Sequence, residues 1–231
     1  MNKDIKVIGF DADDTLWINE PFFIEAEDIF CNLLLAFDTP GQIKAELLKN
    51  ELENLDNYGY GIKGFMLSMV ETAMAVTDNR VEPSVLSSII EIGKNMIKKP
   101  VDILDGVENV LQSLQNKYRL ILATKGDLVD QERKLNKSGL IKYFHHIEIL
   151  SHKKASNYEG LLKHLDIKPK NFLMVGNSLK SDIIPVANLG AHAIHVPFHT
   201  TWALEQVESH EHEHLNYHSV KHINEILDYL L

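Results

Sequence analysis

Five short apolar segments of the chain have the length and composition of buried β-strands. They are KVIGF, RLILAT, HIEIL, FLMVG and AIHVP, at 6–10, 119–124, 146–150, 172–176 and 193–197. Apolar residues run through them without strict alternation, which is typical of strands covered on both faces. Helical patterns follow the second, third and fourth segments, over 127–138, 158–165 and 183–189, with Gly139 and Gly190 just beyond the first and last. This alternation predicts a parallel sheet with right-handed crossovers.

Between the first two of these segments the pattern changes to a helical one. Apolar side chains recur at helical spacing in Phe22, Phe23, Ala26, Ile29, Phe30, Leu33, Leu34 and Phe37. Further helical stretches lie near 41–54, 63–76 and 83–98, and turn signals separate them. We therefore predict a four-helix insertion directly after the first strand. Such an insertion lies above the carboxyl ends of the strands, where open α/β sheets bind ligands.

Composition narrows the class of protein. The chain has 231 residues, 45% hydrophobic and 24% charged, which suits one large soluble domain or one domain with an insertion. Its formal net charge of −10 argues against nucleic acid or an anionic membrane as a partner. Cys31 is the only cysteine, and neither a signal peptide nor a membrane span is evident. These features predict a cytoplasmic protein.

Polar and reactive side chains follow four of the predicted strands. They are Asp11 and Asp13 after the first, Thr124 and Lys125 at the second, Lys153 and Lys154 after the third, and Asn177 and Asp182 after the fourth. The carboxyl ends of parallel strands lie at one edge of the sheet, so these side chains can converge on a single ligand. Three carboxylates within four residues, at 11, 13 and 14, repel one another unless a cation or a catalytic role accounts for them.

Each residue type has a chemical use at such an edge. One aspartate can attack an electrophile while its neighbour transfers a proton. A hydroxyl and backbone N–H groups can hold an anionic oxygen, and a lysine balances the charge of carboxylates and phosphate. An Asn or Asp oxygen can complete the ligand shell of Mg²⁺. Together these parts suit phosphoryl transfer through an aspartyl-phosphate.

In order and spacing, the motifs DADDT, LATKGD, SHKKASNY and GNSLKSD resemble those of the haloacid dehalogenase-like (HAD) hydrolase superfamily. The resemblance is closest to its phosphatase branch with a helical cap inserted after the first motif. It implies a Rossmann-like α/β core domain over 1–17 and 99–231, with helices on both faces of a parallel sheet. The inserted α-helical cap domain would span 18–98.

The resemblance also assigns roles to individual residues. Asp11 is the implied nucleophile and Asp13 the implied general acid/base, while Lys153 braces Asp11 and the phosphate. Thr124 would hold the phosphoryl group, and Lys125 is a second predicted substrate-binding residue. Lys153 stands five residues before a tyrosine, a spacing familiar in this family; the adjacent Lys154 remains the alternative.

Mg²⁺ is the implied cofactor. Its predicted ligands are Asp11, the backbone carbonyl of Asp13, and a side chain of the fourth motif, either Asn177 or Asp182. Many relatives begin that motif with Gly-Asp, whereas this chain has Gly176 followed by Asn177. Asn is a neutral oxygen ligand, so Asp182 could carry more of the charge.

The leading functional hypothesis is a Mg²⁺-dependent phosphatase acting on a small phosphomonoester. A dehalogenase of the same superfamily needs Asp11 but has no use for a proton donor at Asp13 and no need of metal. A phosphomutase would need cap residues that present the intermediate again. A non-catalytic binding module would be expected to lack Asp11, Asp13 or the lysine. The identity of the phosphate ester and the oligomeric state stay open.

The sequence also allows predictions for a third aspartate of the first motif, for a histidine-rich segment and for a glycine-rich turn in the insertion. Asp14 is expected to cap a helix or support the site rather than bind metal. The histidines 210, 212 and 214 alternate with glutamates, and we predict a solvated surface loop there rather than a metal site. Tyr58, Tyr60 and Lys63 flank glycines that would either bring a loop to the substrate or form a turn between helices.

Overall fold

The computed structural model describes residues 4–231, which divide into two compact units by their internal contacts. We call them the core unit, residues 4–20, 101–125 and 133–231, and the helical unit, residues 21–100 together with 126–132. The cap predicted over 18–98 and the core predicted over 1–17 and 99–231 have boundaries within a few residues of these. The short segment 126–132 had been assigned to the core from the sequence.

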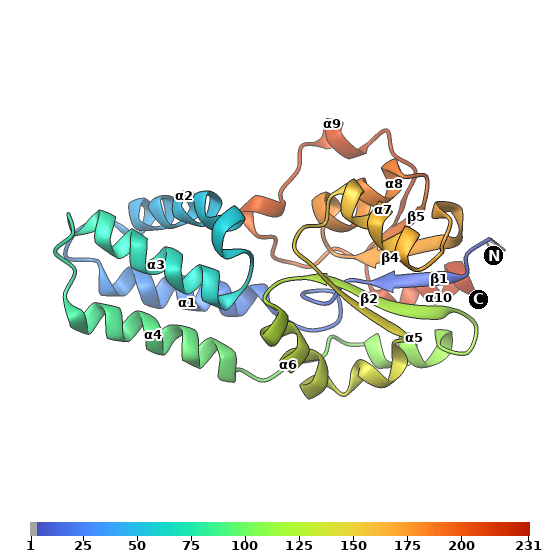
Figure 1. The fold of residues 1–231 in the computed structure, drawn as a ribbon, viewed down its shortest axis with the longest axis horizontal. Coiled ribbons are helices and arrows are strands. Elements are labelled where there is room, and N and C mark those ends of the chain that lie inside the picture. Colours follow the sequence, from blue (N-terminus) through green and yellow to red (C-terminus); the bar gives the residue numbers. More distant parts are fainter. Residues whose placement is uncertain (1–3) are drawn as a thin grey trace. The chain divides into compact units, whose positions relative to one another are not determined.

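The core unit is built on a six-stranded parallel sheet. Its strands are β1 (Val7–Phe10), β2 (Arg119–Lys125), β3 (His146–Leu150), β4 (Phe172–Gly176), β5 (His192–His195) and β6 (His218–Ser219). They lie in the order β3-β2-β1-β4-β5-β6, so β1 is central (Figure 1). The parallel sheet predicted from the sequence is confirmed. Strand β6 was not predicted, because a strand of two residues is too short to show an apolar pattern in the sequence.

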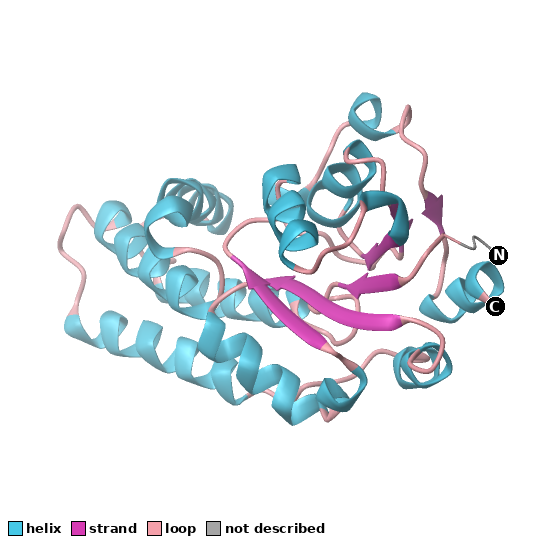
Figure 2. Ribbon diagram, turned by 45° about the vertical axis from the view of Figure 1, so that its right-hand side comes forward, coloured by secondary structure: helices cyan, strands magenta, loops and turns pink. Residues whose placement is uncertain are grey.

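Helices cover both faces of this sheet, as Figure 2 shows with helices in cyan and strands in magenta. They are α5 (Val107–Leu114), α6 (Leu128–Ser138), α7 (Ala155–His164), α8 (Ile184–Asn188) and α10 (Ile226–Leu230). The short helix α9 (Ser209–His212) buries no residue. Successive strand residues point to opposite faces. Ile8 and Phe10 therefore pack in one apolar cluster with α5 and α10, whereas Val7 packs in another with α7 and α8. Both clusters hold the central strand rigidly in place.

The helix predicted over 183–189 is present as α8 (Ile184–Asn188). What the sequence did not predict is the π-helical turn η3 (Leu179–Ile183) that precedes it. The Ser178 side chain caps this turn by accepting from the backbone N–H of Ser181. Pro185 lies in the first turn of α8, where its missing N–H costs no helical hydrogen bond. Single π-turns are uncommon and are often found at functional sites.

The histidine-rich segment at 210–214 lies largely exposed at the surface, as predicted, but begins with the short helix α9 rather than a loop. The side chain of Glu208 accepts from the first turn of α9 and its backbone N–H donates to the Glu211 side chain, which forms a capping box. Because the backbone is helical there, alternate residues do not share one side. Within residues 4–231 no group of three or more His, Cys, Asp or Glu side chains is arranged to hold a metal ion.

The helical unit contains the four predicted helices. They are α1 (Glu20–Leu33), α2 (Pro40–Tyr58), α3 (Ile62–Val76) and α4 (Pro83–Lys98). Their inward faces form one apolar cluster, whose fully buried members include Phe30, Leu34, Ile43, Leu47, Met69 and Ile89. Phe37, which continued the expected pattern, lies beyond α1 and is exposed. None of the helices within residues 4–231 combines the length and apolar character needed to cross a bilayer.

A partly buried carboxyl in α2 makes the stability of this unit depend on pH. Burial, and to a lesser degree the neighbouring Glu27, raise the pKa of Glu51 from 4.5 to about 8. The folded chain therefore binds this proton more tightly than the unfolded chain. Consequently the free energy of unfolding falls as pH rises from about 4.5 to about 8, and levels off above that.

Replacing Glu51 by glutamine removes this titration. We expect E51Q to stabilise the protein more at pH 9 than at pH 5, measured by chemical denaturation at both pH values. Glu53→Gln is the matched control, because Glu53 is exposed on the same helix. An equal effect of E51Q at both pH values would show that Glu51 ionises normally in the folded protein.

Candidate active site

The candidate site begins where the central strand ends. Phe10, the last residue of β1, pairs with Leu122 of β2 on one side and Val175 of β4 on the other. Asp11 follows, and its backbone N–H donates to the carbonyl of Val175 at 2.9 Å. The chain continues from β1 to β2 and β3 on one side, and returns to β4 and β5 on the other. This is the switch point at which α/β sheets form a crevice.

Asp11 is buried and held by two side chains. Its Oδ1 accepts from the Lys153 ammonium at 2.5 Å, and its Oδ2 accepts from the Thr15 hydroxyl at 3.1 Å. The same ammonium donates to Asp182 Oδ1 at 2.6 Å, so one lysine bridges two carboxylates. Lys154, the alternative considered from the sequence, is exposed and is the N-cap residue of α7. The structure therefore brings Lys153, rather than Lys154, to Asp11.

Burial dominates the electrostatics of this group. Burial raises the pKa of Asp11 from 3.8 to about 7. The positive charge of Lys153 lowers this pKa, whereas the negative charges of Asp182 and Asp13 raise it further. Burial alone would lower the pKa of Lys153, but the two facing carboxylates outweigh it and the pKa is well above its usual value. The lysine therefore stays charged, and the cluster carries an excess of negative charge that a cation would relieve.

Asp13 is held by contacts that sequence reasoning missed. Its Oδ1 accepts from the indole N–H of Trp17 and from the Lys134 ammonium, both at 2.6 Å. Trp17 is fully buried, and the Lys134 side chain is only 9% exposed. Lys134 also donates to the side-chain oxygen of Asn19. Lys134 and Leu135 are both buried on the inward face of α6. A lysine on the inward face of a helix is nearly always paired with an acidic group, and this rule could have predicted a carboxylate partner for Lys134.

The Asn177 carboxamide lies against the oxygen atoms expected of a metal site. One of its two end atoms is 3.2 Å from the backbone oxygen of Asp13, 3.2 Å from Thr15 Oγ1 and 3.3 Å from Asp11 Oδ2. As a nitrogen, this atom donates hydrogen bonds to those oxygens; as an oxygen, it joins them in a cluster of acceptors. A carboxylate, a backbone carbonyl and a carboxamide oxygen are ligands that suit Mg²⁺, so these residues fit the predicted ion.

Asp182, the other predicted metal ligand, has different contacts. It is fully buried in the π-helical turn η3, where Oδ1 accepts from Lys153 and Oδ2 accepts from the backbone N–H of Ser178 at 3.0 Å. Tyr158, five residues after Lys153, donates its hydroxyl to the carbonyl of Ser181. These contacts fix Lys153 between α7 and η3, so that Asp182 orients the lysine.

The two predicted substrate-binding residues end strand β2. Thr124 is buried, and the strand register places it two residues beyond Leu122, level with Ala12 of the first motif. Lys125 does not present a free cation. Its ammonium donates to the Ser181 hydroxyl at 2.9 Å and pairs with the Glu205 carboxylate, which sequence reasoning did not single out.

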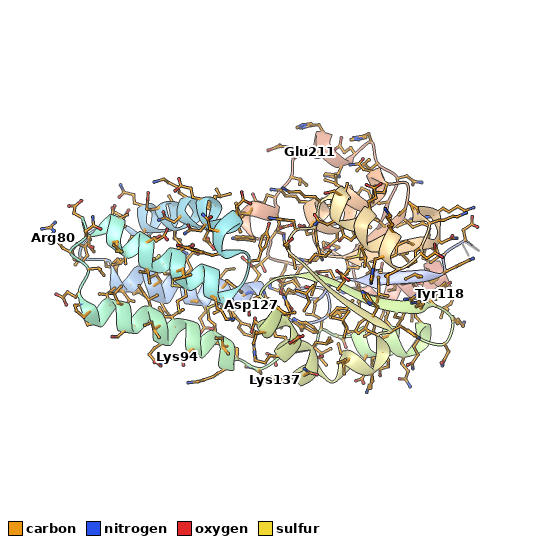
Figure 3. All side chains as sticks on the ribbon, viewed as in Figure 1. Arg80, Lys94, Tyr118, Asp127, Lys137 and Glu211 are labelled. Carbon is orange, nitrogen blue, oxygen red and sulfur yellow. The ribbon has the colours of Figure 1, made fainter. Side chains whose placement is uncertain are left out.

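The remaining candidates have local roles. Asp14 accepts from the backbone N–H groups of Asn19 and Glu20, so it caps the start of α1 as expected, and burial raises its pKa to about 7. In the helical unit, the Lys63 ammonium donates to both carboxylate oxygens of Asp127 at 3.0 Å (Figure 3 labels Asp127). Tyr58 donates its hydroxyl to Glu71 of α3. Tyr58 thus ties the end of α2 to α3, and Lys63 ties the start of α3 to the residue before α6.

Comparison with known proteins gives one family and several similar structures. A family model described as haloacid dehalogenase-like hydrolase matches residues 5–190. A haloacid dehalogenase-like family hydrolase from Xanthomonas campestris is 37% identical, with 89% of this chain and 86% of that chain covered and a TM-score of 0.81. No curated protein matches the chain.

Two more distant structures share the fold. One is described as a predicted phosphoglycolate phosphatase from Haemophilus somnus, with 14% identity, 99% of both chains covered and a TM-score of 0.69. The other is a HAD-type hydrolase from Bacillus subtilis solved bound to magnesium, with 16% identity, 99% of both chains covered and a TM-score of 0.64.

Proposed function

Because the chain belongs to the haloacid dehalogenase-like hydrolases, we propose that it is a Mg²⁺-dependent phosphatase of small phosphomonoesters. One observation carries the proposal. Asp11 is buried against Lys153, and the Asn177 carboxamide lies 3.3 Å from its other oxygen and 3.2 Å from the backbone oxygen of Asp13. That arrangement supplies a nucleophile, a fixed positive charge and a set of oxygen ligands at one strand end.

In the first half of the proposed reaction, a carboxylate oxygen of Asp11 attacks the phosphorus atom. The bond from phosphorus to the ester oxygen breaks, and Asp13 gives its proton to that oxygen as the alcohol leaves. Lys153 balances charge on Asp11 and on the transferred phosphoryl group. Thr124 contributes its hydroxyl to the phosphoryl oxygens, and the alcohol departs with the phosphoryl group retained as an aspartyl-phosphate.

In the second half, the aspartyl-phosphate is hydrolysed. Asp13, now a carboxylate, takes a proton from water as the water oxygen attacks phosphorus, and the bond from phosphorus to Asp11 breaks. Inorganic phosphate leaves and both aspartates return to their starting state. Lys134 and Trp17 hold one oxygen of Asp13, so its carboxyl group keeps one position through both proton transfers.

Asp11, the backbone carbonyl of Asp13 and Asn177 would hold the Mg²⁺ ion, with Asp182 as the remaining candidate ligand. When bound, the ion neutralises charge on Asp11 and the phosphoryl oxygens. This set of oxygens also favours the phosphatase over a dehalogenase, whose chemistry needs neither a cation nor Asp13.

The test is release of phosphate from 4-nitrophenyl phosphate and from a panel of small metabolite phosphates. We expect turnover with Mg²⁺, loss of turnover in excess chelator and recovery when Mg²⁺ is restored. Release of halide from a 2-haloacid in chelator is measured alongside. Halide release without phosphate release would favour the dehalogenase, and absence of Mg²⁺ binding by calorimetry would contradict the phosphatase.

A further inference from the structure

A partly buried carboxylate outside the four motifs joins the loops that follow strands β2 and β4. Glu205 closes a short 3₁₀ turn, η4 (Ala203–Glu205), downstream of β5, and its side chain is only 13% exposed. One of its oxygens pairs with the Lys125 ammonium. The other accepts from the hydroxyls of Ser178 and Ser181, the latter at 2.6 Å. Glu205 thus brings the segment after β5 to the carboxyl edge of the sheet.

The partners of Glu205 also contact the candidate catalytic residues. Ser178 directly follows Asn177, and its backbone N–H donates to Asp182. Ser181 directly precedes Asp182 and receives a hydrogen bond from Lys125 as well. Lys125 itself follows Thr124 at the end of β2. Movement of the Glu205 carboxylate would therefore shift the position of Thr124 and of the turn that carries Asn177 and Asp182.

Charge holds this arrangement together. Burial alone would raise the pKa of Glu205, but Lys125 and the two serine hydroxyls outweigh it and lower the pKa below 4.5. Glu205 is therefore ionised and pairs with Lys125, whose side chain is 17% exposed. Removing the charge of either residue breaks an ion pair between two largely shielded groups, which favours rearrangement of the loop.

We propose that Glu205 is a positioning residue for the phosphatase reaction. It acts through Lys125 and through the Ser178–Ser181 turn, fixing Thr124 on one side of the site and Asn177 on the other. The inference rests on the proposed function, because its readout is phosphate release. It also means that Lys125 serves the site as the partner of Glu205 rather than as a free cation for the substrate.

The experiment compares wild type, E205Q, K125M and the double variant, with Glu208→Gln as the control. Glu208 is an exposed carboxylate three residues further on. For E205Q we expect kcat on 4-nitrophenyl phosphate to fall roughly 10- to 100-fold with KM little changed, as is usual when residues that orient a site are removed. Glu208→Gln should keep wild-type kinetics. Because Glu205 acts through Lys125 and also through Ser178 and Ser181, the double variant should lose more kcat than K125M alone but less than the product of the two single losses.

The outcomes separate this inference from the proposed function. Wild type without turnover on any phosphate overturns both. Active wild type with an equally active E205Q overturns the role of Glu205 alone, and so does a double variant in which the two losses multiply. Should E205Q fail to fold, E205D keeps the charge on a shorter side chain. We expect E205D to fold and to show a kcat below wild type, and a kcat equal to wild type would overturn the inference.

Discussion

Replacing Asp11 by asparagine is expected to abolish phosphate release. The carboxamide has nearly the shape of the carboxylate but cannot form an acyl phosphate, so no intermediate can accumulate or be hydrolysed. Loss of the nucleophile of a covalent mechanism typically reduces kcat by about 10⁴-fold or more. The variant should still fold, because the Asn oxygen can accept from Lys153 while its amide N–H donates to the Thr15 hydroxyl, which reverses the direction of that second bond.

The measurement is phosphate release from 4-nitrophenyl phosphate in Mg²⁺, with Asp14→Asn as the matched control. Asp14 lies in the same cluster of carboxylates but contacts backbone N–H groups at the start of α1, which Asn can also satisfy. We expect D14N to keep most of the wild-type rate. A D11N variant within tenfold of wild type would show that Asp11 is not the nucleophile.

Replacing Lys153 by methionine is expected to remove activity and to destabilise the core unit. Its ammonium is the shared partner of Asp11 and Asp182, and the side chains of all three residues are less than 10% exposed. Without it, two like charges remain buried and close together. Breaking a buried ion pair in this way costs about 3–5 kcal/mol of unfolding free energy.

The matched control is Lys154→Met. Lys154 is adjacent in sequence but exposed, so its replacement should change stability by less than about 0.5 kcal/mol and leave turnover near wild type. Adding D182N to K153M should restore part of the stability, because one buried charge is removed, without restoring turnover. Equal losses in the K153M and K154M variants would contradict the assignment of Lys153 to the site.

Much of the fold was predictable because its signals are local. Strands β3 and β4 occupy the residues expected from their apolar composition, and the four helices of the insertion follow from apolar spacing and turn residues. The prediction was weaker after β4 and β5. There a π-helical turn, the helix α9 and the two-residue strand β6 depend on caps and neighbouring strands rather than on a repeating pattern.

The sequence by itself determined the sheet, the insertion and the edge of the sheet at which Asp11, Asp13, Thr124 and Asn177 lie, because the carboxyl ends of parallel strands share one edge whatever lies between them. Only the tertiary structure decided which charged groups pair. Lys134 forms an ion pair with Asp13, which is 121 residues away in the sequence, and Glu205 forms one with Lys125, which is 80 residues away. Of two adjacent lysines, the structure buries Lys153, which its spacing to Tyr158 already favoured, and leaves Lys154 exposed. The partners of Lys134 and Glu205 depend on distances in the folded chain, which spacing along the sequence does not encode.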